Sequence, residues 1–196
     1  MARIKNQTPG APVYVLVWPV YLILLLTGAP GLQSIKYSSG MAADAQVADA
    51  PNDMFNPGLL FTRADADKIM GESTHLTDSS FNTEPHVTSY LCGYKADVKD
   101  HKTGKTGAIY FLFEQYKDIS EAKIKYESIY LANKPHGAEK VSNLGEESYY
   151  HTDGENFYFI MVRKGKYVFN IKVNKTTSTT SLNEFKKTAG RIAASI

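Results

Sequence analysis

The chain has 196 residues, with 22 Lys and Arg against 20 Asp and Glu and a formal net charge of +2. This near balance argues against a nucleic-acid partner, because nucleic-acid-binding proteins concentrate positive charge on one face or arm. The single cysteine, Cys92, excludes an internal disulfide framework, so a folded domain must be held by its core. We expect Cys92 itself to be a small buried side chain.

The N-terminal part has the pattern of an export or anchoring segment. Residues 1–12 form a short basic start that contains Arg3 and Lys5, and residues 13–29 are uncharged and strongly apolar. About 17 apolar residues are at the lower limit for a membrane-spanning helix and fit a signal peptide as well. The charge that precedes the run predicts that the C-terminal part lies outside the cytoplasm. Residues 13–29 are therefore predicted to be a signal peptide or a membrane anchor.

Residues 30–57 are rich in Ala, Gly, Ser, Asp and Pro and contain few large apolar side chains. Such a composition cannot bury enough surface to offset chain entropy, which predicts a flexible linker. Residues 58–196 suffice for one compact core but not for two of ordinary size. We therefore expect a single extracytoplasmic domain over residues 58–196.

The first elements of this domain are a helix and a loop. Thr62 followed by Asp65 forms a capping box, and Gly71 is a typical helix stop. The segment 72–88 is polar and contains Pro85, and it is predicted to be a loop.

Two hairpins and two further helices follow. Residues 90–98 and 107–116 form one hairpin, and residues 157–163 and 167–173 form another around Lys164-Gly165. Between the hairpins, a helix begins after Asp118 and ends before Pro135, and a turn at 144–146 precedes a short strand. The last helix has Ser181 and Glu184 as its capping box.

Together, these elements predict an α+β fold with an antiparallel sheet of about five strands and helices packed on one side. The N-terminal apolar helix precedes this domain. Three phrases also carry a resemblance: LLFTRADADKIMG at 59–71, LGEESYY at 144–150 and VRKG at 162–165. Their order resembles a loose group of small exported bacterial envelope proteins and lipoproteins of unknown function, some of them PsbP-like. This chain lacks the lipidated cysteine of the lipoproteins, and the resemblance supplies no site residue.

The sequence contains few patterns that indicate chemistry. His75 and His86 lie in the polar segment with Glu72, Asp78 and Glu84, which makes the two histidines candidate metal ligands. There is no H-E-x-x-H or G-x-S-x-G motif, so no catalytic residue or cofactor is predicted. The tripeptide 104–106, Gly-Lys-Thr, resembles the end of a phosphate-binding loop, but the glycine that such a loop needs at position 99 is Lys. It is interpreted as a charged hairpin loop.

Aromatic side chains are the remaining signal. Five tyrosines fall on predicted strands whose other faces already supply core residues: Tyr110, Tyr116, Tyr149, Tyr150 and Tyr158. Tyrosines on an open sheet face provide rigid, amphipathic contact area for a ligand or partner. The alternative is that helices cover them and their hydroxyl groups reach water.

Three hypotheses for function follow. The first is a membrane-tethered or exported, periplasmic or extracellular, non-enzymatic domain that binds an envelope protein or a small ligand. The second is a metal-dependent envelope hydrolase with its site around His75 and His86. The third is a structural spacer within an envelope complex.

Overall fold

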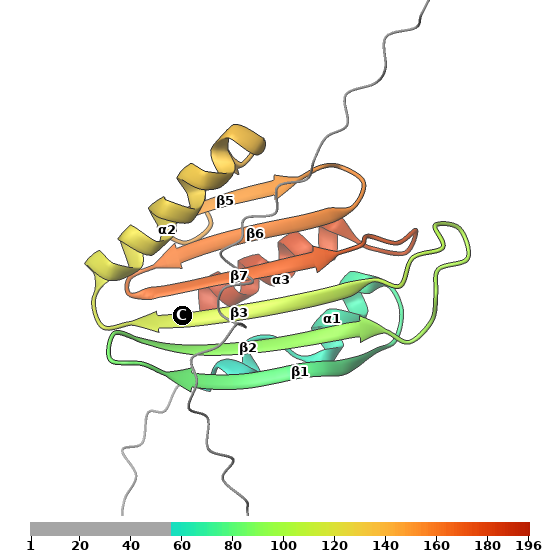
Figure 1. Ribbon diagram of the computed structural model, residues 1–196, viewed down its shortest axis with the longest axis horizontal. Coiled ribbons are helices and arrows are strands. Elements are labelled where there is room, and N and C mark those ends of the chain that lie inside the picture. Colours follow the sequence, from blue (N-terminus) through green and yellow to red (C-terminus); the bar gives the residue numbers. More distant parts are fainter. Residues whose placement is uncertain (1–55) are drawn as a thin grey trace, which may run out of the picture. The chain divides into compact units, whose positions relative to one another are not determined.

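The computed structural model describes residues 56–196 (Figure 1). The predicted apolar helix at 13–29 and nearly all of the predicted linker lie outside these residues. The described helices are the short 3-10 helices η2 (Pro57–Leu59) and η3 (Lys134–His136) and the α-helices α1 (Arg63–Met70), α2 (Ile119–Asn133) and α3 (Leu182–Ser195). Within residues 56–196, none of the helices combines the length and the apolar character needed to cross a membrane.

Seven strands form one sheet in which every neighbouring pair is antiparallel. The strands are β1 (Thr74–Thr83), β2 (Val87–Ala96), β3 (Ala108–Tyr116), β4 (Glu139–Lys140), β5 (Glu147–Thr152), β6 (Phe157–Lys164) and β7 (Tyr167–Asn174). Their order in the sheet is β1-β2-β3-β7-β6-β5-β4. The last long strand, β7, is therefore placed at the centre, between β3 and β6.

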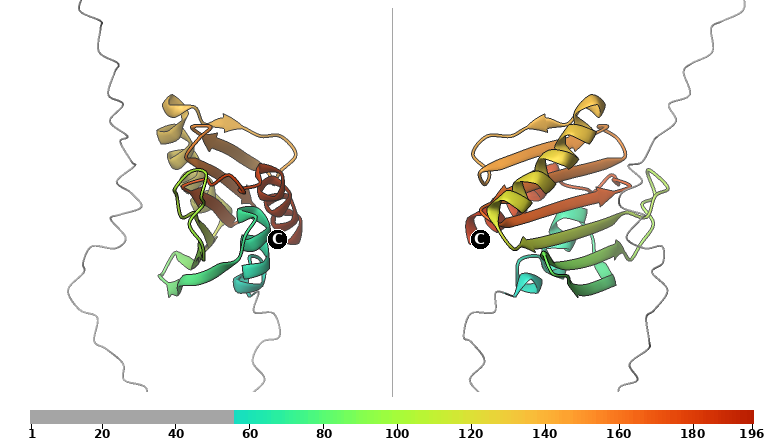
Figure 2. Two further views of the ribbon diagram at one scale, coloured as in Figure 1. Left: turned by 90° about the vertical axis from the view of Figure 1, so that its right-hand side faces the viewer. Right: turned by 60° about the vertical axis from the view of Figure 1, so that its left-hand side comes forward.

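Helices α1 and α3 pack on one face of the sheet, where the larger core lies (Figure 2). Their ends are set by the local signals that the sequence predicts. The Thr62 side chain accepts a hydrogen bond from the Asp65 N–H, the Asp65 carboxylate accepts one from the Thr62 N–H, and Gly71 ends α1 at a left-handed φ of 70°. The Ser181 side chain caps α3 by accepting from the Glu184 N–H.

Helix α2 packs on the opposite face of the sheet, as Figures 1 and 2 show. Ala122 and Tyr126 of the helix and Tyr149, Met161 and Val168 of the sheet form a second, smaller core there. The α+β class and the antiparallel sheet are thus confirmed. The expectation of helices on one side is wrong, and the sheet has seven strands instead of about five.

The predicted loop at 72–88 is also corrected, because most of it is strand β1. All residues of β1 except Thr74 are exposed. An edge strand with little apolar cover needs no apolar alternation, since its backbone pairing with β2 is enough to hold it. The polar composition of this strand is therefore the reason why the sequence pattern predicts a loop.

Candidate functional site

The structure places the two predicted metal ligands at opposite ends of β1. His75 lies near the start of the strand, with its Nδ1 2.6 Å from Asp97 Oδ1. His86 lies in the turn after the strand, with its Nδ1 2.8 Å from Glu121 Oε1. The structure thus does not bring the two histidines together, and within residues 56–196 no group of three or more His, Cys, Asp or Glu could hold a metal ion.

The five tyrosines divide between the two faces of the sheet. Tyr149 is fully buried under α2, and Tyr116 packs partly buried against the same core. Tyr150 and Tyr158 lie on the other face, where both rings contact Phe185 of α3 at centroid distances of 6.3 and 5.9 Å. These four tyrosines therefore belong to the two cores, and the five side chains do not form one binding surface.

Tyr110 has a different setting, because it is partly exposed and belongs to neither of the two cores. The sheet register aligns Tyr110 with Gly93 on β2 and with Lys172 on β7, and Lys172 in turn with Phe159 on β6. The Tyr110 ring lies over Gly93, where an added Cβ would be 2.9 Å from its Cδ1. Burial lowers the pKa of Lys172. We call these four residues the Tyr110 row.

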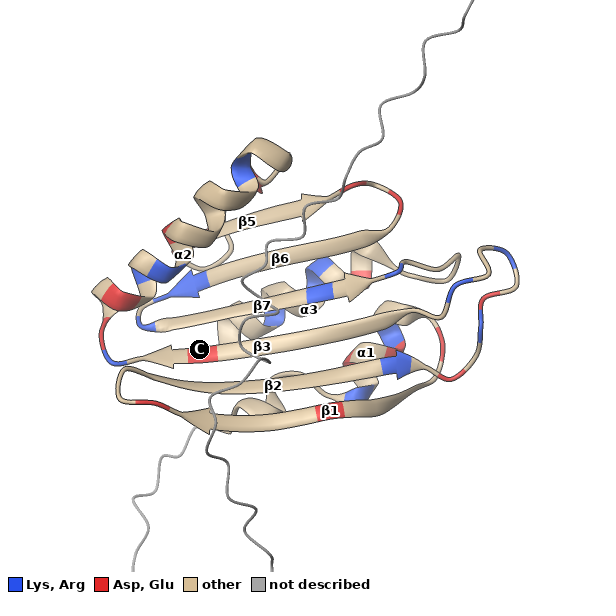
Figure 3. Ribbon diagram, in the orientation of Figure 1, with Lys and Arg blue, Asp and Glu red and all other residues tan. Residues whose placement is uncertain are grey.

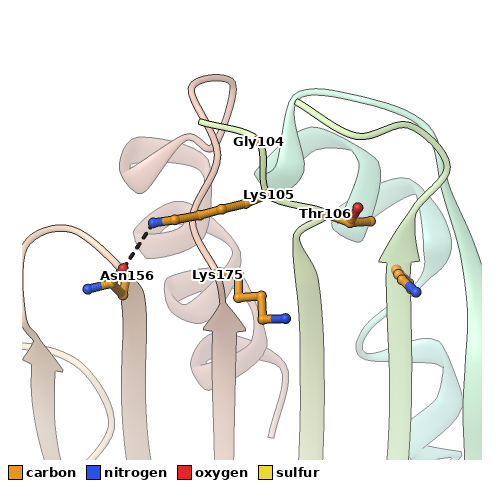
Figure 4. A pocket seen from close by; sticks show the side chains of 6 residues that line it. Gly104, Lys105, Thr106, Asn156 and Lys175 are labelled. Carbon is orange, nitrogen blue, oxygen red and sulfur yellow. Dashed lines mark hydrogen bonds between the residues drawn. The ribbon is translucent and has the colours of Figure 1, made fainter. Parts of the chain in front are cut away.

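A basic hollow of about 530 Å³ lies at the end of the sheet where β2 and β7 end and β3 begins (Figure 4). It is lined by Lys95, Gly104, Lys105, Thr106, Asn156 and Lys175. The Lys105 ammonium donates a hydrogen bond to the Asn156 Oδ1 at 2.9 Å. Among the described residues, no Asp or Glu side chain lines this hollow. We call it the lysine hollow.

Asp100 ties together the two loops that carry two of these lysines. Its carboxylate accepts hydrogen bonds from the Ser178 N–H (2.6 Å), the Ser178 hydroxyl (2.9 Å) and the Thr103 hydroxyl (2.7 Å). The bond from the Ser178 N–H is the largest of several that hold the pKa of Asp100 below its usual range. The β2–β3 loop is thereby fixed to the segment that follows Lys175.

Three ammonium groups and the Thr106 hydroxyl can donate to the oxygens of an anion. Lysine acts as a flexible point charge, so the arrangement suits phosphate, sulfate or carboxylate groups without a fixed bidentate geometry. Lys95 and the Tyr110 row share a face of the sheet, because Lys95 and Gly93 are two residues apart on β2. An anion in the hollow could therefore carry an apolar part that lies along this row.

The lysine hollow is not predicted by any pattern in the sequence. Lys95 and Lys105 belong to one hairpin, whereas Lys175 is distant in the sequence and lies near them because β7 pairs with β3. The only local signal is Gly104-Lys105-Thr106, a pattern that favours a charged hairpin loop over a phosphate-binding loop because position 99 is Lys. Cys92, by contrast, is buried as expected, and burial raises its pKa to about 11.

Comparison of the sequence with protein-family models gave no match, and comparisons with curated proteins and with solved structures gave none either.

Proposed function

We propose that this chain is an exported or membrane-tethered, non-enzymatic binding domain, and that it holds a ligand with an anionic group in the lysine hollow. The observation that carries the proposal is that Lys95, Lys105 and Lys175 line one hollow whose lining contains no acidic side chain. Positive groups in such a setting attract an anion and are repelled by each other, so a bound anion relieves their repulsion.

The Tyr110 row extends this proposal to the apolar part of the ligand. Tyr110 and Phe159 provide aromatic surface on either side of Lys172, and all three side chains are partly exposed. A small amphipathic anion, such as an alkyl or aryl carboxylate, matches both the charge of the hollow and the character of the row.

Titration calorimetry on the full chain tests the binding. The probes are inorganic phosphate and hexanoate, compared between the wild type and the double variant Lys105→Ala/Lys175→Ala. We expect the double variant to lose between about tenfold and about 150-fold in affinity for each lysine removed, because a charge-assisted hydrogen bond contributes about 1.5–3 kcal/mol. Lys123→Ala, on the exposed side of α2, is the matched control and should bind like the wild type. If the wild type bound neither phosphate nor hexanoate, the proposal would be refuted.

The proposed location rests on the basic start and the apolar run at 13–29. An alkaline phosphatase domain fused after Ile196 should be active, because that enzyme requires an oxidising compartment outside the cytoplasm. A reporter enzyme that is active only in the cytoplasm should be inactive when it is fused at the same position. An inactive phosphatase fusion together with an active cytoplasmic reporter would contradict export.

A further inference from the structure

Two leucines lie side by side next to the Tyr110 row, on the face of the sheet that carries helix α2. The register pairs Leu91 on β2 with Leu112 on β3, and it pairs Gly93 with Tyr110 two residues away on the same strands. Side chains two residues apart on a strand share a face, so both leucines lie on the face of the row. Both are partly exposed, and neither belongs to either core. We call Leu91 and Leu112 the leucine pair.

A run of uncharged strand joins the leucine pair to the lysine hollow. Lys95 is the only charged residue of β2, and Glu114, two residues beyond Leu112, is the only charged residue of β3. Figure 3 shows this pattern, with blue near the arrowhead of β2, red near the arrowhead of β3 and uncharged strand between them. Lys95 and Leu91 are four residues apart, which is about 13 Å along a strand. The face therefore offers an apolar track of limited length that begins at the lysines.

The track is also narrow. Ser80 on β1 is aligned with Leu91, and Asn170 on β7 is aligned with Leu112, so a polar residue borders the leucine pair on each side. Neighbouring strands are about 4.8 Å apart, and a track two strands wide suits a single linear chain. Helix α2 stands on the same face of the sheet (Figure 2), so a flat lipid surface would meet the helix before it reached the leucines.

We propose that the leucine pair receives the alkyl chain of a medium-chain carboxylate whose head group lies in the lysine hollow. This inference rests on the proposed anion binding and specifies the ligand. The charges are complementary, because the carboxylate meets the lysines while the chain, which needs no hydrogen-bond partner, crosses the Tyr110 row to Leu91 and Leu112. Extended hexanoate covers about half of this track, whereas extended dodecanoate covers all of it.

The test compares hexanoate with dodecanoate on the full chain by titration calorimetry, at concentrations below micelle formation. We expect dodecanoate to bind at least about tenfold more tightly, because each additional methylene that leaves water on the leucine pair adds to the affinity. Spectra of the ¹⁵N-labelled chain locate the added contact. Dodecanoate should shift the Leu91 and Leu112 amides in a saturable manner, and hexanoate should leave them unchanged.

Serine variants test the leucines themselves. Leu91→Ser and Leu112→Ser should each reduce the affinity ratio of dodecanoate to hexanoate at least about threefold. Their hexanoate affinity should equal that of the wild type, which also shows that the variant is folded. Leu76→Ser is the matched control and should keep the wild-type ratio. Leu76 is 53% exposed on β1, and its alignment with Tyr94 of the larger core places it on the opposite face.

The outcomes separate this inference from the proposed function. If the wild type bound hexanoate and dodecanoate equally tightly, the leucine pair would have no role and anion binding would stand. A gain for dodecanoate that both serine variants retain would overturn the inference as well. If the serine variants fail to fold, the wild-type amide shifts decide, and their absence at Leu91 and Leu112 refutes the inference. A wild type that bound neither phosphate nor either carboxylate would refute the proposed function too.

Discussion

Asp100 helps to position the lysine hollow without lining it, because it joins the β2–β3 loop to Ser178. We predict that Asp100→Asn frees this junction and weakens phosphate binding severalfold. An asparagine can accept only through its single Oδ1, and it carries no charge to strengthen the bonds. The direct measurement is hydrogen exchange at the Ser178 amide, which should be at least about tenfold faster in the variant.

The hydrogen bonds between Asp100 and Ser178 should weaken at low pH only. The folded-state pKa of Asp100 is lowered, so the contribution of its carboxylate is complete above the unfolded value of about 3.9 and is lost as the pH falls through the folded value. The Ser178 amide of the wild type should therefore stay protected from pH 7 to pH 5. Asp78→Asn, an exposed acidic site on β1, is the control and should leave this protection unchanged. Loss of protection between pH 7 and pH 5 would contradict the assignment.

Arg163 is a buried charged residue whose removal should destabilise the fold, because it would break two ion pairs. It is 5% exposed, and its guanidinium pairs with Glu146 and Glu147 and donates to the Gly165 carbonyl oxygen at 3.0 Å. We predict that Arg163→Ala lowers the free energy of unfolding by about 2–4 kcal/mol, because it leaves partly buried acceptors without a donor. Urea denaturation measures this loss, and Lys123→Ala should change stability by less than about 0.5 kcal/mol.

At the level of elements, helix α3 contains an interior glycine that no contact requires. A Cβ added to Gly190 would meet nothing within 4 Å, and Gly190 has no left-handed φ. We predict that Gly190→Ala raises the free energy of unfolding by about 0.5–1 kcal/mol, because alanine loses less backbone entropy on folding.

Gly107 provides the opposite case for the same substitution. A Cβ added there would lie 2.2 Å from the Met70 side chain and 3.1 Å from the Lys175 carbonyl oxygen. Gly107→Ala should therefore lower the midpoint of thermal unfolding, whereas Gly190→Ala should raise it. If both variants moved the midpoint in the same direction, the packing described for these two positions would be wrong.

The elements also show which features a sequence can predict. The helix starts at Thr62 and Ser181 were predictable because an N-cap interaction is made within four residues. The capping box is complete at Thr62, whereas at Ser181 only the side-chain bond forms and the Ser181 N–H donates to the Ile69 carbonyl oxygen. The position of α2 was not, because its buried contacts come from Ala122 and Tyr126 while the large apolar Ile124 faces outward. A helix with apolar residues on both sides gives no periodic signal for the face that it buries.

On the scale of the whole molecule, the sites depend on strand order more than on motifs. The lysine hollow exists because β7 lies between β3 and β6, which brings Lys175 near Lys105. The turn after β1 likewise reaches helix α2, where His86 pairs with Glu121. Neither pairing has a sequence spacing that could have been recognised, whereas the class of fold follows from local patterns alone.

The two cores share the central strands, which has a consequence for how the domain unfolds. On β7, Phe169 and Ile171 belong to the core under α1 and α3, while Val168 belongs to the core under α2. One core cannot lose its packing without disturbing the strand that supports the other. We therefore predict one cooperative transition for residues 56–196.

Two substitutions, one in each core, test this prediction. Phe111→Ala in the larger core should lower the free energy of unfolding by about 3–5 kcal/mol, and Met161→Ala in the smaller core by about 2–5 kcal/mol. Each variant should shift the whole transition, with far-ultraviolet and tyrosine near-ultraviolet circular dichroism giving the same midpoint. A Met161→Ala protein whose tyrosine signal melts well before its backbone signal would mean that α2 and its core unfold separately, because Tyr126 and Tyr149 are fully buried in that core.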